Sequence, residues 1–308
     1  MNMNATSKPA PAAGAALHAM LGDYPNTLAL KRGELASPLV TFDFVEAKVP
    51  NQAFKRVVRE IEFDVAELAI VTFLQAKSYG KPLVLLPAVV GPGRFQHQCL
   101  IYNAERGHLD PSRLAGKRIG MRSYAQTTPA WIRGILQSEY AVDLDSIHWL
   151  GFEDGHLSEY KDPPQVERAG KDQQLLPMLL AGELDAIIIG NEAPEDARLK
   201  PVIAEPRAAA LAWCARHKAV PVNHLVVVRE ALSRERPQQV REVFRLLAES
   251  KARGPGVAAG ATNFFPFGVE ACRPSLKIII EYAYAQGLLA RRLQVDELFD
   301  DTTRTLGA

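Results

Sequence analysis

Strand-like apolar runs alternate with helical segments along most of this chain, and this alternation limits its possible folds more than any other feature. The segment 81–90, KPLVLLPAVV, is apolar after its first residue, as expected for a strand buried on both faces. Helical spacing precedes it in 51–63 and in the later part of 64–80, and a strand–turn–helix unit follows in 114–142. This order is typical of α/β proteins with mostly parallel sheets.

The chain is long enough for about two domains, at 308 residues. We predict two lobes, each a mostly parallel sheet flanked by helices, with a ligand cleft between them. The chain would cross between the lobes near GRFQHQCLIY and PVNHLVVVRE, because polar residues stand there at the entrance of apolar strands. The predicted division is a disordered leader at 1–16, a first lobe formed by 17–98 and 229–308, and a second lobe at 99–228.

Composition excludes several classes of partner. The net charge is +1 and no basic run occurs, which speaks against nucleic acid and against an anionic membrane surface. No apolar run reaches the roughly 20 residues of a membrane span. The N-terminus lacks the features of a signal peptide, and the three cysteines form no CxxC pair. We therefore expect a cytoplasmic protein.

The motif GPGRFQHQCLIY, residues 91–102, places polar side chains where a buried strand should begin. Read as a strand, it puts Arg94, Gln96 and Gln98 on one face and Phe95 and His97 on the other. One interpretation is an anion site in which Arg94 binds a carboxylate and His97 acts as an acid or base. The alternative is a solvated strand start with a structural arginine.

The motif GMRSYAQTTPAW, residues 120–131, places Arg122, Ser123, Gln126 and Thr127 at a strand-to-helix turn. The backbone N–H groups and the dipole of a helix start favour an anion, and the hydroxyl groups add donors. Ordinary N-capping would explain Ser123 or Thr127 but not Arg122. The pattern favours an anion site.

Two further motifs carry histidines. In FEDGHLSEY, a carboxylate of Glu153 or Asp154 would orient His156 as an acid or base, whereas the simpler interpretation is an acidic surface loop. Asn223 and His224 stand at the mouth of the apolar strand in 221–230, where a histidine is more often a hydrogen-bonded core residue. Neither HExxH nor a phosphate-binding GxxxxGK[ST] motif is present.

RFQHQ, RSYAQTT, FEDGH and the NH of PVNHLVVVRE together resemble the 4,5-dihydroxyphthalate decarboxylase family, over nearly the whole chain. The resemblance implies a periplasmic-binding-protein-like fold of type II topology. It also implies non-oxidative loss of CO2 from 4,5-dihydroxyphthalate, or a closely related hydroxylated aromatic dicarboxylate, to give protocatechuate without an organic cofactor. The chain departs from the family in GPGRF, where a shorter GRF turn is expected.

The resemblance also suggests residue roles. Arg94, Arg122, Ser123 and Thr127 would bind the carboxylates, with Gln126 and Asn223 as further substrate contacts. His156, tuned by Glu153 or Asp154, would protonate the ring carbon. Either His224 or His97 would take the catechol proton.

Three alternatives remain at this point. The chain is a solute-binding protein, cytoplasmic or exported, that captures an aromatic or small carboxylate without chemistry. It decarboxylates a different hydroxylated aromatic acid. Or a divalent metal held by Glu153, Asp154, His156 or His224 binds the catechol oxygens. The expected partner is a small aromatic carboxylate, and a homo-oligomer is compatible with all of these.

Overall fold

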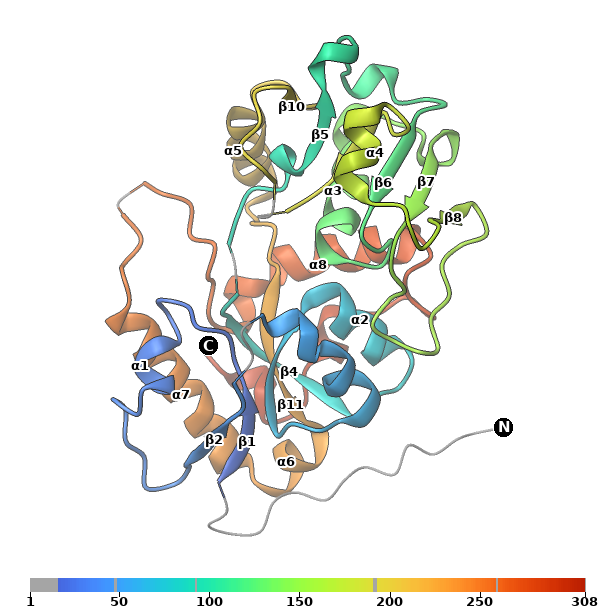
Figure 1. Ribbon diagram of the computed structural model, residues 1–308. Coiled ribbons are helices and arrows are strands. Elements are labelled where there is room, and N and C mark those ends of the chain that lie inside the picture. Colours follow the sequence, from blue (N-terminus) through green and yellow to red (C-terminus); the bar gives the residue numbers. More distant parts are fainter. Residues whose placement is uncertain (1–15, 47–48, 92, 191–192, 259, 308) are drawn as a thin grey trace. The chain divides into compact units, whose positions relative to one another are not determined.

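The computed structural model describes residues 16–46, 49–91, 93–190, 193–258 and 260–307, so residues 1–15 of the predicted leader lie outside it (Figure 1). Its internal contacts divide the chain into two compact units. Unit 1 comprises Met1–Gly93, Val222–Ile280 and Leu289–Ala308, and unit 2 comprises Arg94–Pro221 and Glu281–Leu288.

The elements follow one another in the alternating order that the sequence predicts. The strands are β1 (Leu17–Met20), β2 (Phe42–Phe44), β3 (Val65–Ala69), β4 (Leu83–Val89), β5 (Leu100–Asn103), β6 (Arg118–Met121), β7 (His148–Gly151), β8 (Val166–Arg168), β9 (Ala186–Ile188), β10 (Leu199–Pro201) and β11 (His224–Arg229). The α-helices are α1 (Leu28–Lys31), α2 (Ile70–Ser78), α3 (Thr127–Tyr140), α4 (Leu175–Ala181), α5 (Pro206–His217), α6 (Glu230–Glu235), α7 (Pro237–Arg253) and α8 (Val269–Ala285). Short helices of other types are η1 (Pro50–Ala53), η2 (Arg56–Glu60), η3 (His97–Cys99), η4 (Ala104–Arg106), η5 (Pro111–Arg113), η6 (Leu144–Ser146), η7 (Val295–Leu298) and η8 (Thr303–Thr305).

The sheet of unit 1 has the strand order β2-β1-β3-β11-β4. Strands β1, β2 and β3 run parallel, and β11 pairs antiparallel with both β3 and β4. In Figure 1, β11 is the orange strand among the blue and teal ones. A late segment of the chain therefore completes the middle of a sheet whose other strands come from its first ninety residues.

A hydrophobic core joins this sheet to α7. Val240, Val243 and Leu246 of α7 pack in one buried cluster with side chains of β1, β3, β4 and β11. Burying such side chains stabilises the fold by about 1.5–3 kcal/mol each.

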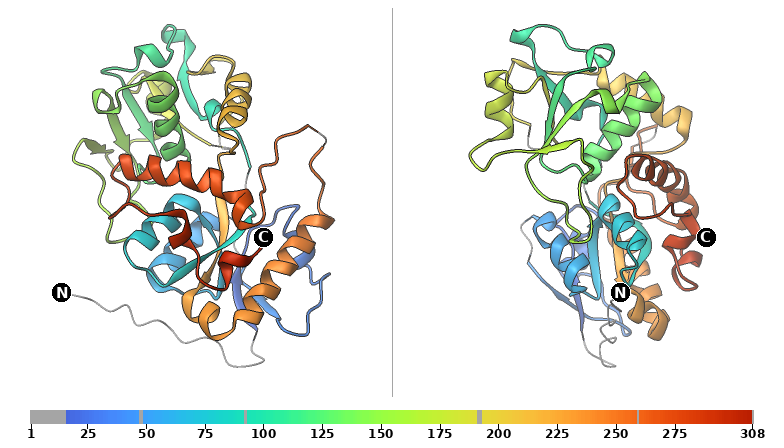
Figure 2. Two further views of the ribbon diagram at one scale, coloured as in Figure 1. Left: turned by 180° about the vertical axis from the view of Figure 1, so that it is seen from behind. Right: turned by 90° about the vertical axis from the view of Figure 1, so that its right-hand side faces the viewer.

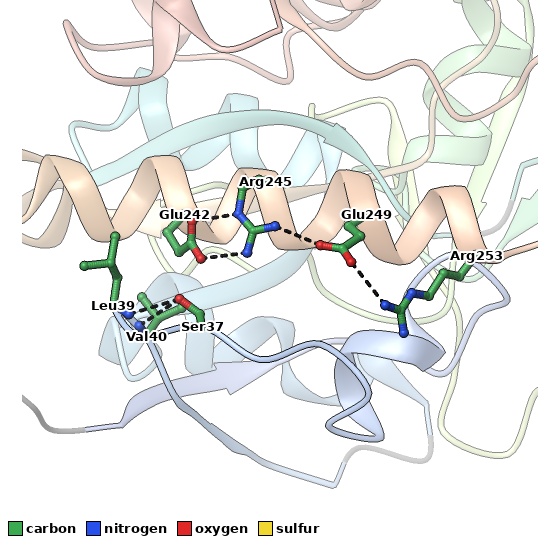
Figure 3. Close-up of polar contacts among 7 residues, drawn as sticks. All are labelled: Ser37, Leu39, Val40, Glu242, Arg245, Glu249 and Arg253. Atoms are coloured by element: carbon green, nitrogen blue, oxygen red, sulfur yellow. Dashed lines mark hydrogen bonds and ion pairs between the residues drawn. The ribbon is translucent and has the colours of Figure 1, made fainter.

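The polar side of α7 carries a chain of ion pairs formed by Glu242, Arg245, Glu249 and Arg253 (Figure 3). Hydrogen bonds from Arg245 lower the pKa of Glu242 to about 2. Polar residues thus occupy the side of α7 that the core leaves outside, as expected for an amphipathic helix.

The sheet of unit 2 has the order β10-β5-β9-β6-β7-β8. Strands β6, β7, β8 and β9 run parallel, and β5 pairs antiparallel with β9 and β10. If it is read from β7, the order β7-β6-β9-β5-β10 repeats that of unit 1, with β5 in the place of β11. The prediction of mostly parallel sheets flanked by helices is confirmed, and among the described strands each sheet has one antiparallel member.

Helices cover both faces of the unit 2 sheet, with α3 and α4 on opposite sides (Figure 2). Met178 and Leu179 of α4 pack against Ile187 in β9. On the other face, Met121 of β6 contacts the guanidinium of the fully buried Arg133 in α3. Successive residues of a strand point to opposite faces, which places α3 and α4 where the sequence alternation requires.

The division into units differs from the predicted lobe boundaries at three points. The sequence boundary placed residues 99–228 in the second lobe, whereas β11 pairs with β3 and β4 and therefore lies in unit 1. Residues 94–98 fall in unit 2, and so do residues 281–288, which the sequence analysis placed in the first lobe. Strand pairing, which a single sequence does not reveal, causes the shift at β11.

The predicted strand faces of RFQHQ are wrong. His97–Cys99 form a 3₁₀ turn in which Cys99 N–H donates to the Gln96 carbonyl at 2.8 Å, and β5 begins only at Leu100. The two alternating faces proposed for residues 94–98 therefore do not exist. After this turn the chain enters β5, which runs antiparallel to the neighbouring strand β9.

In the described part of the chain, no helix is both long enough and apolar enough to cross a membrane.

Candidate functional site

Polar residues gather in each unit at the edge where the parallel strands end. An antiparallel strand begins at the edge where its parallel neighbours finish. His224, the first residue of β11, therefore pairs with Ala69 at the end of β3. Leu100, the first residue of β5, pairs in the same way with Ile188 at the end of β9. Such edges are the usual ligand sites of α/β sheets.

In unit 1, His224 is bound to a fully buried carboxylate. Its Nδ1 lies 2.5 Å from Oε1 of Glu67, which stands in the middle of β3 and has 0% of its side chain exposed. Tyr24 O–H donates to the same oxygen at 2.8 Å, and the Gly22 N–H donates to Oε2 at 2.7 Å. Burial and the nearby Glu67 carboxylate raise the pKa of Tyr24, so its hydroxyl keeps its proton.

The His224 ring is enclosed on two further sides. The ring of Phe54 meets it edge-on, with 5.2 Å between centroids. A Cβ at position 91 would lie 2.5 Å from His224 Nδ1 and 2.6 Å from Glu67 Oε1, so only glycine fits beside this pair. The remaining exposure of the His224 side chain is 17%.

In unit 2, Arg94 is held at the start of α3. Its Nη2 donates to Thr128 Oγ1 at 2.6 Å. A Cβ at position 190, just after β9, would lie 2.8 Å from the same nitrogen. Gly190 therefore leaves the space that the guanidinium occupies.

Arg122 is held beside the same helix start. With the amide oxygen of Gln126 turned toward it, Arg122 Nε donates to that oxygen at 2.6 Å, and Nε also lies 3.8 Å from Glu153 Oε2. Gln126 is the N-cap residue of α3 and Thr128 its second residue. The two predicted arginines are therefore anchored two residues apart at one helix N-terminus, which itself favours an anion.

Three more of the predicted residues are buried, and two of them, Ser123 and Thr127, lie near this helix start. Ser123 Oγ has no hydrogen-bond partner within the described residues, and an anion would supply one. Thr127 is the first residue of α3. Asn223 belongs to unit 1, where its backbone carbonyl accepts from Ile70 N–H at 2.8 Å.

His97 differs from His224 in its surroundings. It is 1% exposed, packs edge-on to Trp213, and its Nδ1 has no partner within the described residues. Burial lowers the pKa of His97 to about 4, although the Glu139 carboxylate acts in the opposite direction. The imidazole is therefore neutral at neutral pH.

The FEDGH loop follows β7 in unit 2, and its His156 is half-buried. Both predicted carboxylates face arginines. Asp154 Oδ1 lies 2.7 Å from Arg168 Nη2, and Glu153 faces Arg122. The prediction that one of them tunes His156 stays a prediction.

Within the described residues, no group of three or more histidine, cysteine, aspartate and glutamate side chains is arranged to hold a metal ion.

The sequence analysis missed Glu67, Thr128 and the two glycines at 91 and 190. Glu67 had a signal, because an ionisable residue inside an apolar strand such as VAELA is rare unless it is paired. Thr128 was part of a motif already singled out. The glycines had no signal that separates them from ordinary turn residues.

Two curated relatives match this chain. One is a 4,5-dihydroxyphthalate decarboxylase from Comamonas testosteroni, 27% identical over 292 residues, which cover 81% of this chain and 86% of the relative. The other is a 4,5-dihydroxyphthalate decarboxylase from Pseudomonas putida, 32% identical over 154 residues, which cover 47% of this chain and 58% of the relative. No family model matches the sequence.

Solved structures share the fold at low identity. The alkanesulfonate-binding protein SsuA from Xanthomonas axonopodis pv. citri is 13% identical, covers 94% of this chain and 99% of its own, and has a TM-score of 0.50. The periplasmic aliphatic sulphonate binding protein SsuA from Escherichia coli is 12% identical, covers 92% and 97%, and has a TM-score of 0.51.

The chain therefore shares its α/β fold, two sheets flanked by helices, with these periplasmic sulphonate-binding proteins, and polar residues stand at the strand-end edge of each sheet. Its sequence is similar to the two 4,5-dihydroxyphthalate decarboxylases, and the resemblance predicted from the motifs is confirmed.

Proposed function

We propose that this protein is a carboxy-lyase that converts 4,5-dihydroxyphthalate, or a closely related hydroxylated aromatic dicarboxylate, to protocatechuate and CO2. The two curated relatives support the reaction. The anchoring of Arg94 and Arg122 at the N-terminus of α3 carries the proposal, because it prepares a site for carboxylate groups.

The substrate itself supplies the electrons for the reaction. Each carboxylate of 4,5-dihydroxyphthalate lies para to a hydroxyl group. Removing the phenolic proton pushes negative charge onto the ring carbon that bears the carboxylate, and that carbon then takes a proton. The C–C bond breaks, CO2 leaves, and its electron pair restores the aromatic ring as a phenolate, which regains a proton.

Residues of unit 2 fit the binding part of this task. Arg94 and Arg122 would bind the carboxylates, with donors from Ser123 and Thr127 and a further contact from Gln126. Asn223, which belongs to unit 1, would be another substrate contact. An arginine–carboxylate hydrogen bond contributes about 1.5–3 kcal/mol, and a helix N-terminus adds a favourable partial charge.

Two histidines share the proton transfers in this proposal. His224 takes the phenolic proton, and we prefer it to His97 because its ring keeps some exposure and has a carboxylate partner. His156 would deliver the proton to the ring carbon. On this assignment His156→Ala lowers kcat about 10²–10⁴-fold; a variant that keeps full turnover would remove His156 from the mechanism.

No organic cofactor is required by this chemistry, because the phenolate provides the electron source. A cytoplasmic location remains part of the proposal, as does a small aromatic substrate. A solute-binding protein is the alternative from another class, and it needs donors for an anion but no proton acceptor.

The test mixes the purified protein with 4,5-dihydroxyphthalate, with and without EDTA, and follows protocatechuate and CO2. Turnover both with and without EDTA would support the proposed reaction by a mechanism that needs no metal. Turnover that EDTA abolishes would move the histidines and carboxylates into a metal-dependent mechanism. A ligand-dependent rise in melting temperature without product would favour the solute-binding alternative.

A further inference from the structure

The Glu67 carboxylate is completely shielded from solvent in the folded protein. The side chain is completely buried in β3, and its ion-pair partner among the described residues is His224. A charge taken out of water is tolerated only when it is paired and hydrogen-bonded. The groups around Glu67 therefore reveal its ionisation state.

Hydrogen-bond donors converge on this carboxylate. The Gly22 N–H donates to Oε2, and an amide N–H cannot accept in return. Tyr24 keeps its proton and donates to Oε1. Two such donors stabilise the ionised form, and an ionised carboxylate has only acceptor sites to offer.

The state of Glu67 determines the tautomer of His224. The imidazole Nδ1 lies 2.5 Å from Oε1, so it must carry the proton of that hydrogen bond. In the neutral ring the other nitrogen, Nε2, then bears a lone pair. Among the residues that the structure describes, none forms a hydrogen bond to Nε2.

The surroundings fix the ring in this orientation. Phe54 meets one edge of the ring, and the backbone at Gly91 lies against the Nδ1–Oε1 contact. Rotation of the ring would break its bond to Glu67 and leave a buried carboxylate without its partner. Nε2 is therefore the ring nitrogen that remains available.

We infer that Glu67 is a positioning residue that holds His224 with its proton on Nδ1 and with Nε2 ready to accept the phenolic proton of the substrate. This inference rests on the proposed function for the identity of the proton donor. Nε2 takes the proton from the substrate hydroxyl, the oxygen keeps the electron pair as a phenolate, and the resulting imidazolium faces the Glu67 carboxylate. After CO2 has left, Nε2 returns the proton to the product phenolate. The sequence offered either His224 or His97 as the base, and this inference assigns the role to His224.

The first experiment measures the tautomer in the unaltered protein. Ring nitrogens of ¹⁵N-histidine-labelled protein are observed by long-range ¹H–¹⁵N NMR, and His224→Gln identifies the signal. We expect a protonated Nδ1 and an unprotonated Nε2 in the neutral ring. A proton on Nε2 would overturn the inference without any need for a Glu67 variant to fold.

The second experiment separates turnover from binding. Glu67→Gln keeps the size of the side chain but removes its charge, and we expect kcat to fall about 10²–10⁴-fold, the contribution of a general base that depends on the correct tautomer. KM should change less than about threefold, because Glu67 does not touch the substrate. A folded variant with full kcat would contradict the inference.

Glu62→Gln is the matched control. Glu62 also faces a histidine in unit 1, with 3.6 Å between its Oε1 and His18 Nε2, but it lies outside the site. We expect its kcat to match that of the unaltered protein. If the unaltered protein does not turn over 4,5-dihydroxyphthalate, the proposed function fails while the NMR result still decides the state of His224.

Discussion

His224 and His97 occupy corresponding places in the two units and have opposite environments. Each lies just where the chain enters the antiparallel strand of a sheet, β11 in unit 1 and β5 in unit 2. His224 is bound to the buried carboxylate of Glu67 and keeps 17% of its side chain exposed. His97 is almost completely buried, and its pKa falls to about 4. The same residue type therefore serves as a candidate base in one unit and as a neutral core residue in the other.

The difference comes from residues that each unit contributes around its histidine. In unit 1, Glu67 of β3 forms a hydrogen bond with His224. In unit 2, the indole of Trp213 in α5 packs against His97 instead. Unit 2 instead collects its charge on Arg94 and Arg122 at the start of α3. Under the proposed function, unit 1 would carry out proton transfer and unit 2 would bind the anion, and the following variants test this assignment.

The largest expected effect is a difference in kcat between variants of the two histidines. We expect His224→Gln to lower kcat about 10²–10⁴-fold, because it removes a general base. His97→Gln should lower kcat less than tenfold, since the proposed mechanism gives that ring no role in proton transfer. Steady-state turnover of 4,5-dihydroxyphthalate measures both, and equal losses in the two variants would break the comparison.

The pH dependence of stability should reveal the buried state of His97. Its pKa is about 4 in the folded protein, against 6.5 for the free side chain. Between these values the unfolded chain binds a proton that the folded protein does not, so the free energy of unfolding falls as the pH falls from 6.5 toward 4. At 1.36 kcal/mol per pH unit, the loss approaches about 3 kcal/mol.

Urea unfolding between pH 7 and pH 4 measures this loss, and His97→Gln supplies the control. The variant should lack the contribution of His97, so the difference in unfolding free energy between the two proteins should narrow as the pH falls. Parallel pH profiles of the two proteins would show that His97 is not the group responsible.

The arginines should affect binding more than turnover. Arg122→Ala removes one charge-assisted contact, worth about 1.5–3 kcal/mol, and should raise KM tenfold or more. Arg118, which lies in β6 and pairs with the exposed Glu167, supplies the control variant Arg118→Ala. If Arg122→Ala lowers kcat and leaves KM unchanged, unit 2 does more than bind the anion.

The smallest effect on kinetics is expected from replacing a glycine beside each site. Gly91 lies beside His224 and Glu67, and Gly190 lies beside Arg94. In Gly190→Ala the new Cβ meets the end of the Arg94 side chain, which can move, so we expect a few-fold rise in KM with little loss of stability. In Gly91→Ala it meets His224 Cβ and the Glu67 carboxylate, which cannot move without breaking their pair. That variant should lose about 1–3 kcal/mol of stability and should also lower kcat. Thermal unfolding and steady-state kinetics of both variants measure the contrast, and an equal effect on KM would contradict it.

Sequence reasoning predicted those parts of the fold that depend on local pattern. The apolar run at 81–90 contains β4, and the strand–turn–helix unit at 114–142 contains β6 and α3. The turn at residues 97–99 was not predicted, because its polar residues are equally compatible with the start of a strand. The assignment of β11 to unit 1 was not predicted either, because strand pairing depends on residues far away in the chain.

The candidate site shows the same limit. Arg94 and Arg122 were found from their own motifs, but their anchors at the start of α3 became visible only in the structure. Glu67 lies 157 positions from His224 in the sequence. No local pattern around PVNH indicates a carboxylate partner, and so the two histidines could not be told apart before their neighbours were known.

The place of β11 in its sheet also has a consequence for synthesis on the ribosome. Strands β3 and β4 flank it, yet more than 130 residues separate β4 from β11, and these residues build most of unit 2. While they are being translated, the nascent first sheet has an open slot with unpaired backbone edges on both sides. Such edges attract other extended chains. We expect a truncated chain that ends before β11 to aggregate. Adding residues 222–253, which supply β11 and the core-forming helix α7, should reduce that aggregation.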